Sequence, residues 1–114
     1  MDPAFIIRFG VSLIMIVFGI HQILEPGHWL EYIPPWLEKL SPISPKADMR
    51  LHASGNIIFG LLFVSNIFPI AGGWIVLIWW LSILPFAFRK NWAIGMRDLT
   101  IILSIVAYLT LINI

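Results

Sequence analysis

Two sets of polar side chains recur at a spacing of four residues within an otherwise apolar chain. His21 and Glu25 form the first set, and Asp48, His52 and Asn56 form the second. Residues four apart lie on one face of a helix, so each set would present its side chains together. A carboxylate beside an imidazole can orient it for proton transfer or for hydrogen bonding to a ligand. The simpler alternative is that these residues only cap helix ends and reach into water.

A third polar pair, Arg97-Asp98, stands at the start of the last apolar run. Fourteen of the sixteen Asp, Glu, Lys, Arg and His side chains fall in two windows, 21–52 and 89–98. If the apolar runs cross a membrane in succession, both windows emerge on the same side of it. We therefore expect the two helical sets and this pair to meet in one polar vestibule at the mouth of a helix bundle.

The composition requires a membrane. Hydrophobic residues make up 60% of the 114 residues and charged residues 11%, against about 25% charged in soluble domains; the mean hydropathy is +0.93. A water-soluble fold of this size could not bury so much apolar surface. A net charge of +1 argues against a nucleic-acid partner. The chain has no cysteine, which excludes disulfides, thiol chemistry and iron–sulfur ligation.

Four apolar segments predict the elements that must position these side chains. We expect an all-α, integral membrane four-helix bundle as a single domain over 1–114, with helices at about 5–24, 48–68, 72–88 and 98–114. The connection 25–47 is long and contains two short amphipathic pieces, 28–33 and 36–40, broken by Pro34-Pro35. Its tryptophan and tyrosine residues favour the headgroup layer, so we expect an interfacial or re-entrant loop.

The other connections are short. Residues 68–73 predict a tight, uncharged turn, and residues 89–95 predict a short basic connection. Six of the seven Lys and Arg residues flank the polar windows, and Arg8 alone lies towards the other side. The positive-inside rule then places both windows in the cytoplasm. The expected location is the plasma or inner membrane of the cell, crossed several times.

Helix 72–88 carries Trp79-Trp80 at mid-span, too deep for an aromatic belt at the interface. Adjacent helical positions point to different faces. Simple packing is the favoured interpretation of the two rings. The alternative is that one of them lines a pocket for a flat apolar ligand such as a quinone or a sterol, while the other faces lipid. The chain has no recognised metal-ligand motif such as HExxH, so we expect no metal site.

Taken in order, several short motifs resemble the DoxX family of small four-helix membrane proteins. The resemblance covers most of the chain, from about residue 8 to 110. Its motifs are Arg8-Phe9-Gly10 and residues 18–24 in the first helix, then Pro26 and Trp29, Ile33-Pro34-Pro35-Trp36-Leu37 in the loop, Gly55 and Gly60-Leu61-Leu62 in the second helix, and Gly95-Met96-Arg97-Asp98-Leu99 at the fourth.

The resemblance implies a redox neighbourhood more than an enzyme. Named members of the wider group are linked to thiosulfate:quinone oxidation and to membrane redox complexes. Many members carry a glutamate at the position of Asn56, so any proton chemistry of that glutamate is in doubt here. The implied function is an accessory membrane subunit that binds a quinone, a lipid or a similar hydrophobe, with the cofactor supplied by a redox partner and none intrinsic to the chain.

Two other functions stay open. A permease or channel subunit would need a pore between protomers or a polar path towards Arg8, and only Ser12, Ser65 and Asn66 line such a path. A purely structural subunit of a larger membrane complex would need no site at all. In each case the partners are the lipid bilayer and either further copies of the chain or other membrane subunits. No residue type or spacing identifies a catalytic group.

Overall fold

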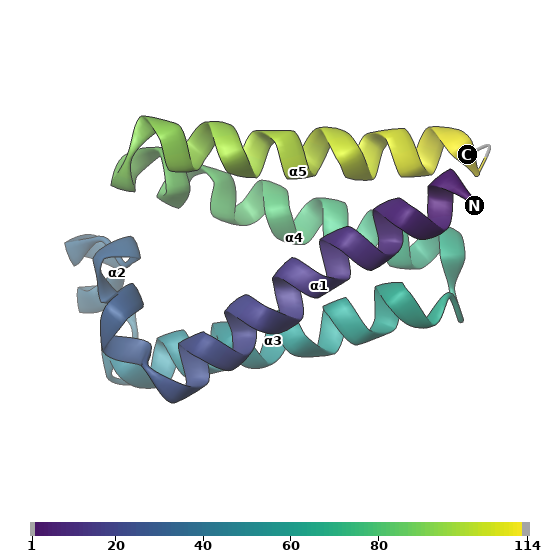
Figure 1. The fold of residues 1–114 in the computed structure, drawn as a ribbon. Coiled ribbons are helices and arrows are strands. Elements are labelled where there is room, and N and C mark those ends of the chain that lie inside the picture. The colour runs from purple at the N-terminus through teal and green to yellow at the C-terminus, as the bar shows by residue number, and fades with distance from the viewer. Residues whose placement is uncertain (1, 113–114) are drawn as a thin grey trace.

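The computed structural model describes residues 2–112, and within that range the chain is all-helical (Figure 1). This confirms the predicted fold class at its coarser level. The elements are α1 (Pro3–Leu24), the short 3₁₀ helix η1 (Pro26–Tyr32), α2 (Pro35–Leu40), α3 (Pro45–Ser65), α4 (Pro69–Lys90) and α5 (Trp92–Leu111). Three of them, α1, α4 and α5, are long and apolar enough to cross a membrane. That is compatible with a multi-pass membrane protein.

Proline sets most of the helix starts. Its fixed φ suits the first helical turn, and its missing N–H costs nothing there because that group would be unpaired. Side-chain caps add to this at Asp2, Ser44 and Asn91, whose oxygens accept hydrogen bonds from backbone N–H groups two or three residues later. The prolines near a helix start are Pro3, Pro26, Pro35, Pro45 and Pro69.

The turn predicted at 68–73 lies earlier than expected. Helix α3 ends at Ser65, the chain turns at Asn66 with a left-handed φ of 59°, and α4 already begins at Pro69. Gly72 and Gly73 are therefore helical and buried. Their lack of a side chain serves packing, because a Cβ on Gly73 would lie 2.9 Å from the ring of Tyr108.

The predicted basic connection 89–95 is wrong. Helix α4 continues to Lys90 and α5 begins at Trp92, so Asn91 alone joins the two helices. The extended backbone of Asn91 reverses the chain, and its side-chain oxygen caps α5 through the N–H of Ala93 at 2.7 Å. The last helix consequently starts six residues before position 98, and residues 113–114 of its predicted range lie outside the described residues.

The long helices pack as two antiparallel pairs, α1 with α3 and α4 with α5, and the pairs meet through α1–α5 and α3–α4 contacts (Figure 1). At one end lie both termini of the described chain and the turn after α3. At the other end lie η1, α2 and the connection at Asn91, which carry the two polar windows. The fully buried side chains of Phe63, Ile105 and Tyr108 fill the interior away from that polar end.

Tyr108 joins α5 to the start of α4. Its hydroxyl donates a hydrogen bond of 2.9 Å to the carbonyl oxygen of Pro69, and the residue is fully buried. We expect Tyr108→Phe to lower the free energy of unfolding by about 1 kcal/mol, the usual net worth of such a bond. Denaturation of the detergent-solubilised protein measures this. Thr110→Val, which removes an exposed hydroxyl on the same helix, should change stability by less than about 0.5 kcal/mol; equal effects of the two variants would contradict the expectation.

Candidate functional site

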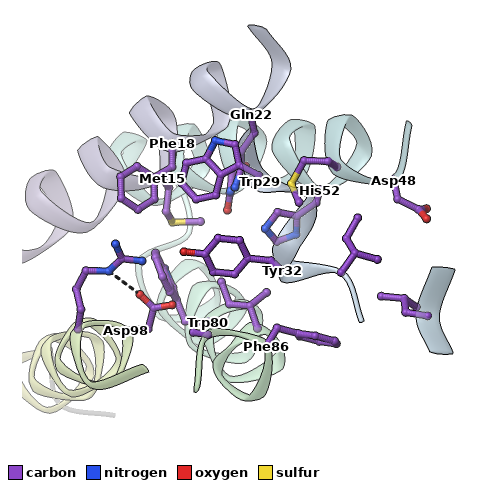
Figure 2. A pocket seen from close by; sticks show the side chains of 17 residues that line it. Met15, Phe18, Gln22, Trp29, Tyr32, Asp48, His52, Trp80, Phe86 and Asp98 are labelled. Atoms are coloured by element: carbon purple, nitrogen blue, oxygen red, sulfur yellow. Dashed lines mark hydrogen bonds and ion pairs between the residues drawn. The ribbon is translucent and has the colours of Figure 1, made fainter. Parts of the chain in front are cut away.

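A cavity of about 250 Å³ opens at the polar end, where the two windows of charged residues come together (Figure 2). Side chains from α1, η1, α2, α3, α4 and α5 line it, so the whole fold contributes to its walls. Most of the lining is apolar. The lining residues are Met15, Phe18, Gln22, Trp29, Tyr32, Ile33, Leu37, Asp48, Met49, His52, Asn56, Trp80, Ile83, Phe86, Ala87, Arg97 and Asp98.

One wall is fixed by a hydrogen-bond chain that crosses three helices. The indole Nε1 of Trp79 on α4 donates to Oδ1 of Asn56 on α3 at 2.7 Å. The Nδ2 of Asn56 in turn donates to Oε1 of Gln22 on α1 at 2.9 Å. Asn56 and Gln22 are each only 4% exposed. Buried amides must be hydrogen-bonded, so this chain fixes the register of α1, α3 and α4 at the level of the cavity.

The opposite wall carries a buried acid. Asp98 is 4% exposed, and its Oδ1 accepts from Nε of Arg97 at 3.0 Å. Arg97 is partly exposed and lies over the ring of Phe18, with its guanidinium carbon 5.3 Å from the ring centroid. The guanidinium thus pairs with the carboxylate and packs on an aromatic face. Helix α5 can bring both residues to the cavity because Asn91 starts it close to the end of α4.

Aromatic rings from η1 cover the cavity. Trp29 stacks on Tyr32 at 5.6 Å between centroids and tilts against Phe18 at 5.4 Å. Figure 2 shows the Tyr32 hydroxyl directed towards the interior of the cavity, between the α3 and α5 walls. Three polar contacts hold η1 in place. Trp29 Nε1 donates to His21 Nδ1 at 2.7 Å, Glu31 of η1 forms an ion pair with Lys90 at the end of α4, and Arg89 donates to the carbonyl oxygen of Glu31 at 3.3 Å.

The predicted site residues divide into two groups. Asp48, His52, Asn56, Trp80, Arg97 and Asp98 line the cavity. His21, Glu25 and Trp79 do not. His21 and Glu25 pair with each other instead, with Nε2 and Oε2 3.3 Å apart and side chains that are 42% and 69% exposed. We expected this pair to lie in the vestibule. In the structure Gln22, the residue after His21, lies on the face of α1 that lines the cavity instead.

Trp79 and Trp80 also differ from the simple expectation. Trp80 is buried and lines the cavity, the position that the alternative interpretation gave to one of the two rings. Trp79 does not simply face lipid: its ring lies parallel to that of His52, at 4.9 Å and 12°, and edge-on to Phe59. The neighbouring helix α3 covers Trp79 because Gly55 leaves room for it there.

Sequence reasoning missed three important lining residues. Gln22 is an amide inside an apolar helix, and its need for a hydrogen-bond partner in lipid would have marked it as a site residue. Trp29 and Tyr32 read as headgroup anchors. They line the cavity instead because the 3₁₀ helix turns back over the bundle, and no signal in the sequence fixes that turn.

The cavity suits one flat, substituted ring. An apolar cavity of about 150 Å³ holds benzene, and this one is larger at about 250 Å³. Aromatic rings of Phe18, Trp29 and Trp80 would contact the faces and edges of such a ring. Hydrogen-bonding groups stand on two sides, with His52 and Asn56 on α3 and the Arg97–Asp98 pair on α5. An oxygen-bearing aromatic ligand would find partners on both sides.

Comparison of the chain with protein-family models, with curated proteins and with solved structures finds no match among any of the three.

Proposed function

We propose that the chain is a DoxX-like membrane subunit whose four long helices all span the bilayer as one bundle. Helix α3 is the least apolar of the four, because it begins with the charged residues Lys46, Asp48 and Arg50. Its 21 residues measure about 31 Å, enough to cross the hydrocarbon core. Beyond its first turns its outward face is apolar, with Leu51, Ile58 and other large side chains exposed. Lipid is the natural solvent for that face.

In this proposal η1 and α2 form the interfacial segment on the polar side. Helix α2 has no buried residue, and it exposes Trp36 and Leu40 beside Glu38 and Lys39. A short helix with that mixture suits the boundary between headgroups and acyl chains. The basic residues at this end favour the cytoplasmic side of the plasma or inner membrane.

The cavity is proposed to bind a quinone or a similar small hydrophobic ligand. One observation carries this: a cavity of about 250 Å³ has aromatic walls with hydrogen-bonding side chains on two sides. Quinones are flat, apolar rings with a carbonyl oxygen at each of two positions, so each oxygen would meet one polar wall. The chain contains no cysteine and no cofactor fingerprint. It would therefore serve a redox partner that carries out the electron transfer, as the DoxX resemblance implies.

Permeation ranks below binding for a structural reason. Between the cavity and the opposite end of the described chain the interior is filled by Phe63, Ile105 and Tyr108, each at most 1% exposed. A continuous aqueous path through a single copy would have to displace these side chains. A role as a purely structural subunit would leave the cavity and the hydrogen-bonding side chains that line it without a function.

Binding of duroquinone to the protein in lipid nanodiscs tests the proposal. Trp29 and Trp80 line the cavity, so bound quinone should quench tryptophan fluorescence to saturation. Ala87 is buried and lines the cavity, and Ala87→Leu would fill part of it. We expect this variant to weaken duroquinone binding about tenfold or more, because the larger side chain occupies the ligand's volume.

The matched control is Ala107→Leu, the same change at an exposed position on α5. It should bind duroquinone like the wild type. If quenching is linear in quinone concentration and equal in all three proteins, the quinone only partitions into lipid, and the proposed function fails.

A further inference from the structure

We propose that Trp79 is a positioning residue: it holds the imidazole of His52 so that the ring nitrogens face the ligand in the cavity. Trp79 itself does not line the cavity, whereas His52 does. This inference deepens the proposed function and rests on it, because it assigns His52 as the ligand's hydrogen-bonding partner on the α3 wall.

His52 is held by one face of its ring. The imidazole and the Trp79 indole lie nearly parallel, with centroids 4.9 Å apart and planes at 12°. Stacking occupies a face of the imidazole and leaves the nitrogens on its edge available. Within residues 2–112 the His52 side chain has no hydrogen-bond or ion-pair partner, and Figure 2 shows the ring directed into the cavity beside Tyr32. Its nitrogens are therefore open to a ligand.

The Trp79 indole has more contacts that fix its orientation than the His52 imidazole has. Its Nε1 donates to Oδ1 of Asn56 at 2.7 Å, and Asn56 is tied to Gln22 on α1. Phe59 meets the indole edge-on, with centroids 5.0 Å apart and planes at 70°. Two contacts of different kinds, a hydrogen bond and an aromatic pair, thus set the plane of the indole. That plane sets the plane of the imidazole.

Gly55 makes this arrangement possible. It lies on α3 directly under the indole, and a Cβ there would be 2.9 Å from Cζ2 of Trp79 and closer still to Cη2. Real Cβ atoms do not approach other atoms so closely, so even alanine would displace the indole. Gly55 is one turn from His52 and next to Asn56 on the same helix. The stack is therefore built where α3 has no side chain between its backbone and the indole.

Position matters because a hydrogen bond from an imidazole needs a heavy-atom distance of about 2.7–3.2 Å and good alignment. Without the indole, His52 would rotate into the vacated space and lose that alignment. The ligand's oxygen would then lose its hydrogen bond to His52, whereas the contacts of the ligand's ring would be unchanged. A quinone and a hydrocarbon of the same shape should therefore respond differently.

Duroquinone and durene make the test, since durene has the same tetramethylated ring without the two oxygens. Durene affinity is measured by its displacement of duroquinone from the protein in nanodiscs. His52→Phe keeps a ring on Trp79 and removes the nitrogens; we expect it to weaken duroquinone about tenfold and to leave durene unchanged. Trp79→Leu should do the same by releasing His52. Trp79→Phe keeps a stacking ring and should restore most of the duroquinone affinity.

The double variant separates positioning from direct contact. If Trp79 acts through His52, then His52→Phe with Trp79→Leu should bind duroquinone no more weakly than His52→Phe alone. Gly55→Ala should resemble Trp79→Leu. Two controls should bind both probes like the wild type: Trp74→Leu at an exposed position on α4, and Gly10→Ala, where no atom lies within 4 Å of the added methyl group.

Three results would overturn the role: additive losses in the double variant, equal weakening of duroquinone and durene by Trp79→Leu, or no recovery in Trp79→Phe. In each of these cases the wild type still binds duroquinone, and the proposed function stands. If the wild type binds neither probe, the proposed function fails as well.

A ligand-free measurement tests the geometry alone. Stacking on the indole should shift the ring-proton resonances of His52 upfield, and Trp79→Leu and Gly55→Ala should both remove that shift. Unshifted resonances in the wild type would overturn the positioning role whatever the ligand.

Discussion

Arg97→Leu is expected to destabilise the protein by about 3 kcal/mol, since it leaves a buried acid without its partner. The side chain of Asp98 is 5% exposed and that of Arg97 is 44% exposed, and the two groups meet at 3.0 Å. A carboxylate taken out of water is stable only while a positive group or hydrogen-bond donors compensate it. Because Arg97 is partly solvated, we place the loss at the lower end of the range for buried pairs. Denaturation in mild detergent measures it.

Replacing both partners should cost much less. In the double variant Arg97→Leu with Asp98→Leu no charge is left uncompensated, and we expect stability within about 1 kcal/mol of the wild type. The control is Arg89→Leu, which removes an exposed arginine that donates a hydrogen bond to the carbonyl oxygen of Glu31 and forms no ion pair within residues 2–112. An Arg97→Leu protein as stable as the Arg89→Leu protein would show that Asp98 does not depend on its partner.

Gly19→Ala is expected to cost about 2 kcal/mol, near the middle of the range for overpacked positions. Helix α1 crosses α3 at Gly19, where an added Cβ would lie 2.9 Å from the carbonyl oxygen of Ala53 and still closer contacts would be made with α3 side chains. A backbone oxygen cannot rotate away as a flexible side chain can. The two helices would have to separate, and this pair holds the α1–α3 side of the cavity.

The matched substitution is Gly10→Ala on the same helix, where no atom lies within 4 Å of the added methyl group. There alanine should be neutral or stabilising by up to about 1 kcal/mol, because it favours the helix over the unfolded chain. The difference between the two variants isolates close packing from helix propensity. Similar stabilities for both would mean that α1 and α3 do not approach as closely as described.

The general arrangement of the site followed from the spacing of polar residues. Asp48, His52 and Asn56 share a helical face, and that face does line the cavity. Arg97-Asp98 reaches the same cavity because the apolar runs alternate in direction. These inferences depend only on helix geometry and on the two helices of opposite direction that separate the windows. The apolar segments of a sequence are enough to predict both.

The rest depended on contacts that spacing cannot specify. Whether His21 or Gln22 faces inward is decided by the rotation of α1 against α3, which close packing at Gly19 controls. Trp79 and Trp80 are neighbours in sequence with different roles because Gly55 accommodates only one indole. The fold of η1 over the cavity depends on the contact of Trp29 with His21, eight residues earlier on α1, and on the contacts of Glu31 with Arg89 and Lys90 of α4. All three arrangements depend on how separate segments pack against one another, and the composition of a single segment does not determine that packing.

The single-residue connection at Asn91 has a consequence for biosynthesis. Helices α4 and α5 can pair as soon as both have left the ribosome, because their contacts are close in sequence. The partner of α1, in contrast, is separated from it by the whole of η1 and α2. The cavity has walls from both pairs, so it is complete only when the start of α5 delivers Arg97 and Asp98. A chain stalled before that point would contain every member of the Trp79–Asn56–Gln22 hydrogen-bond chain but would lack the α5 wall of the cavity.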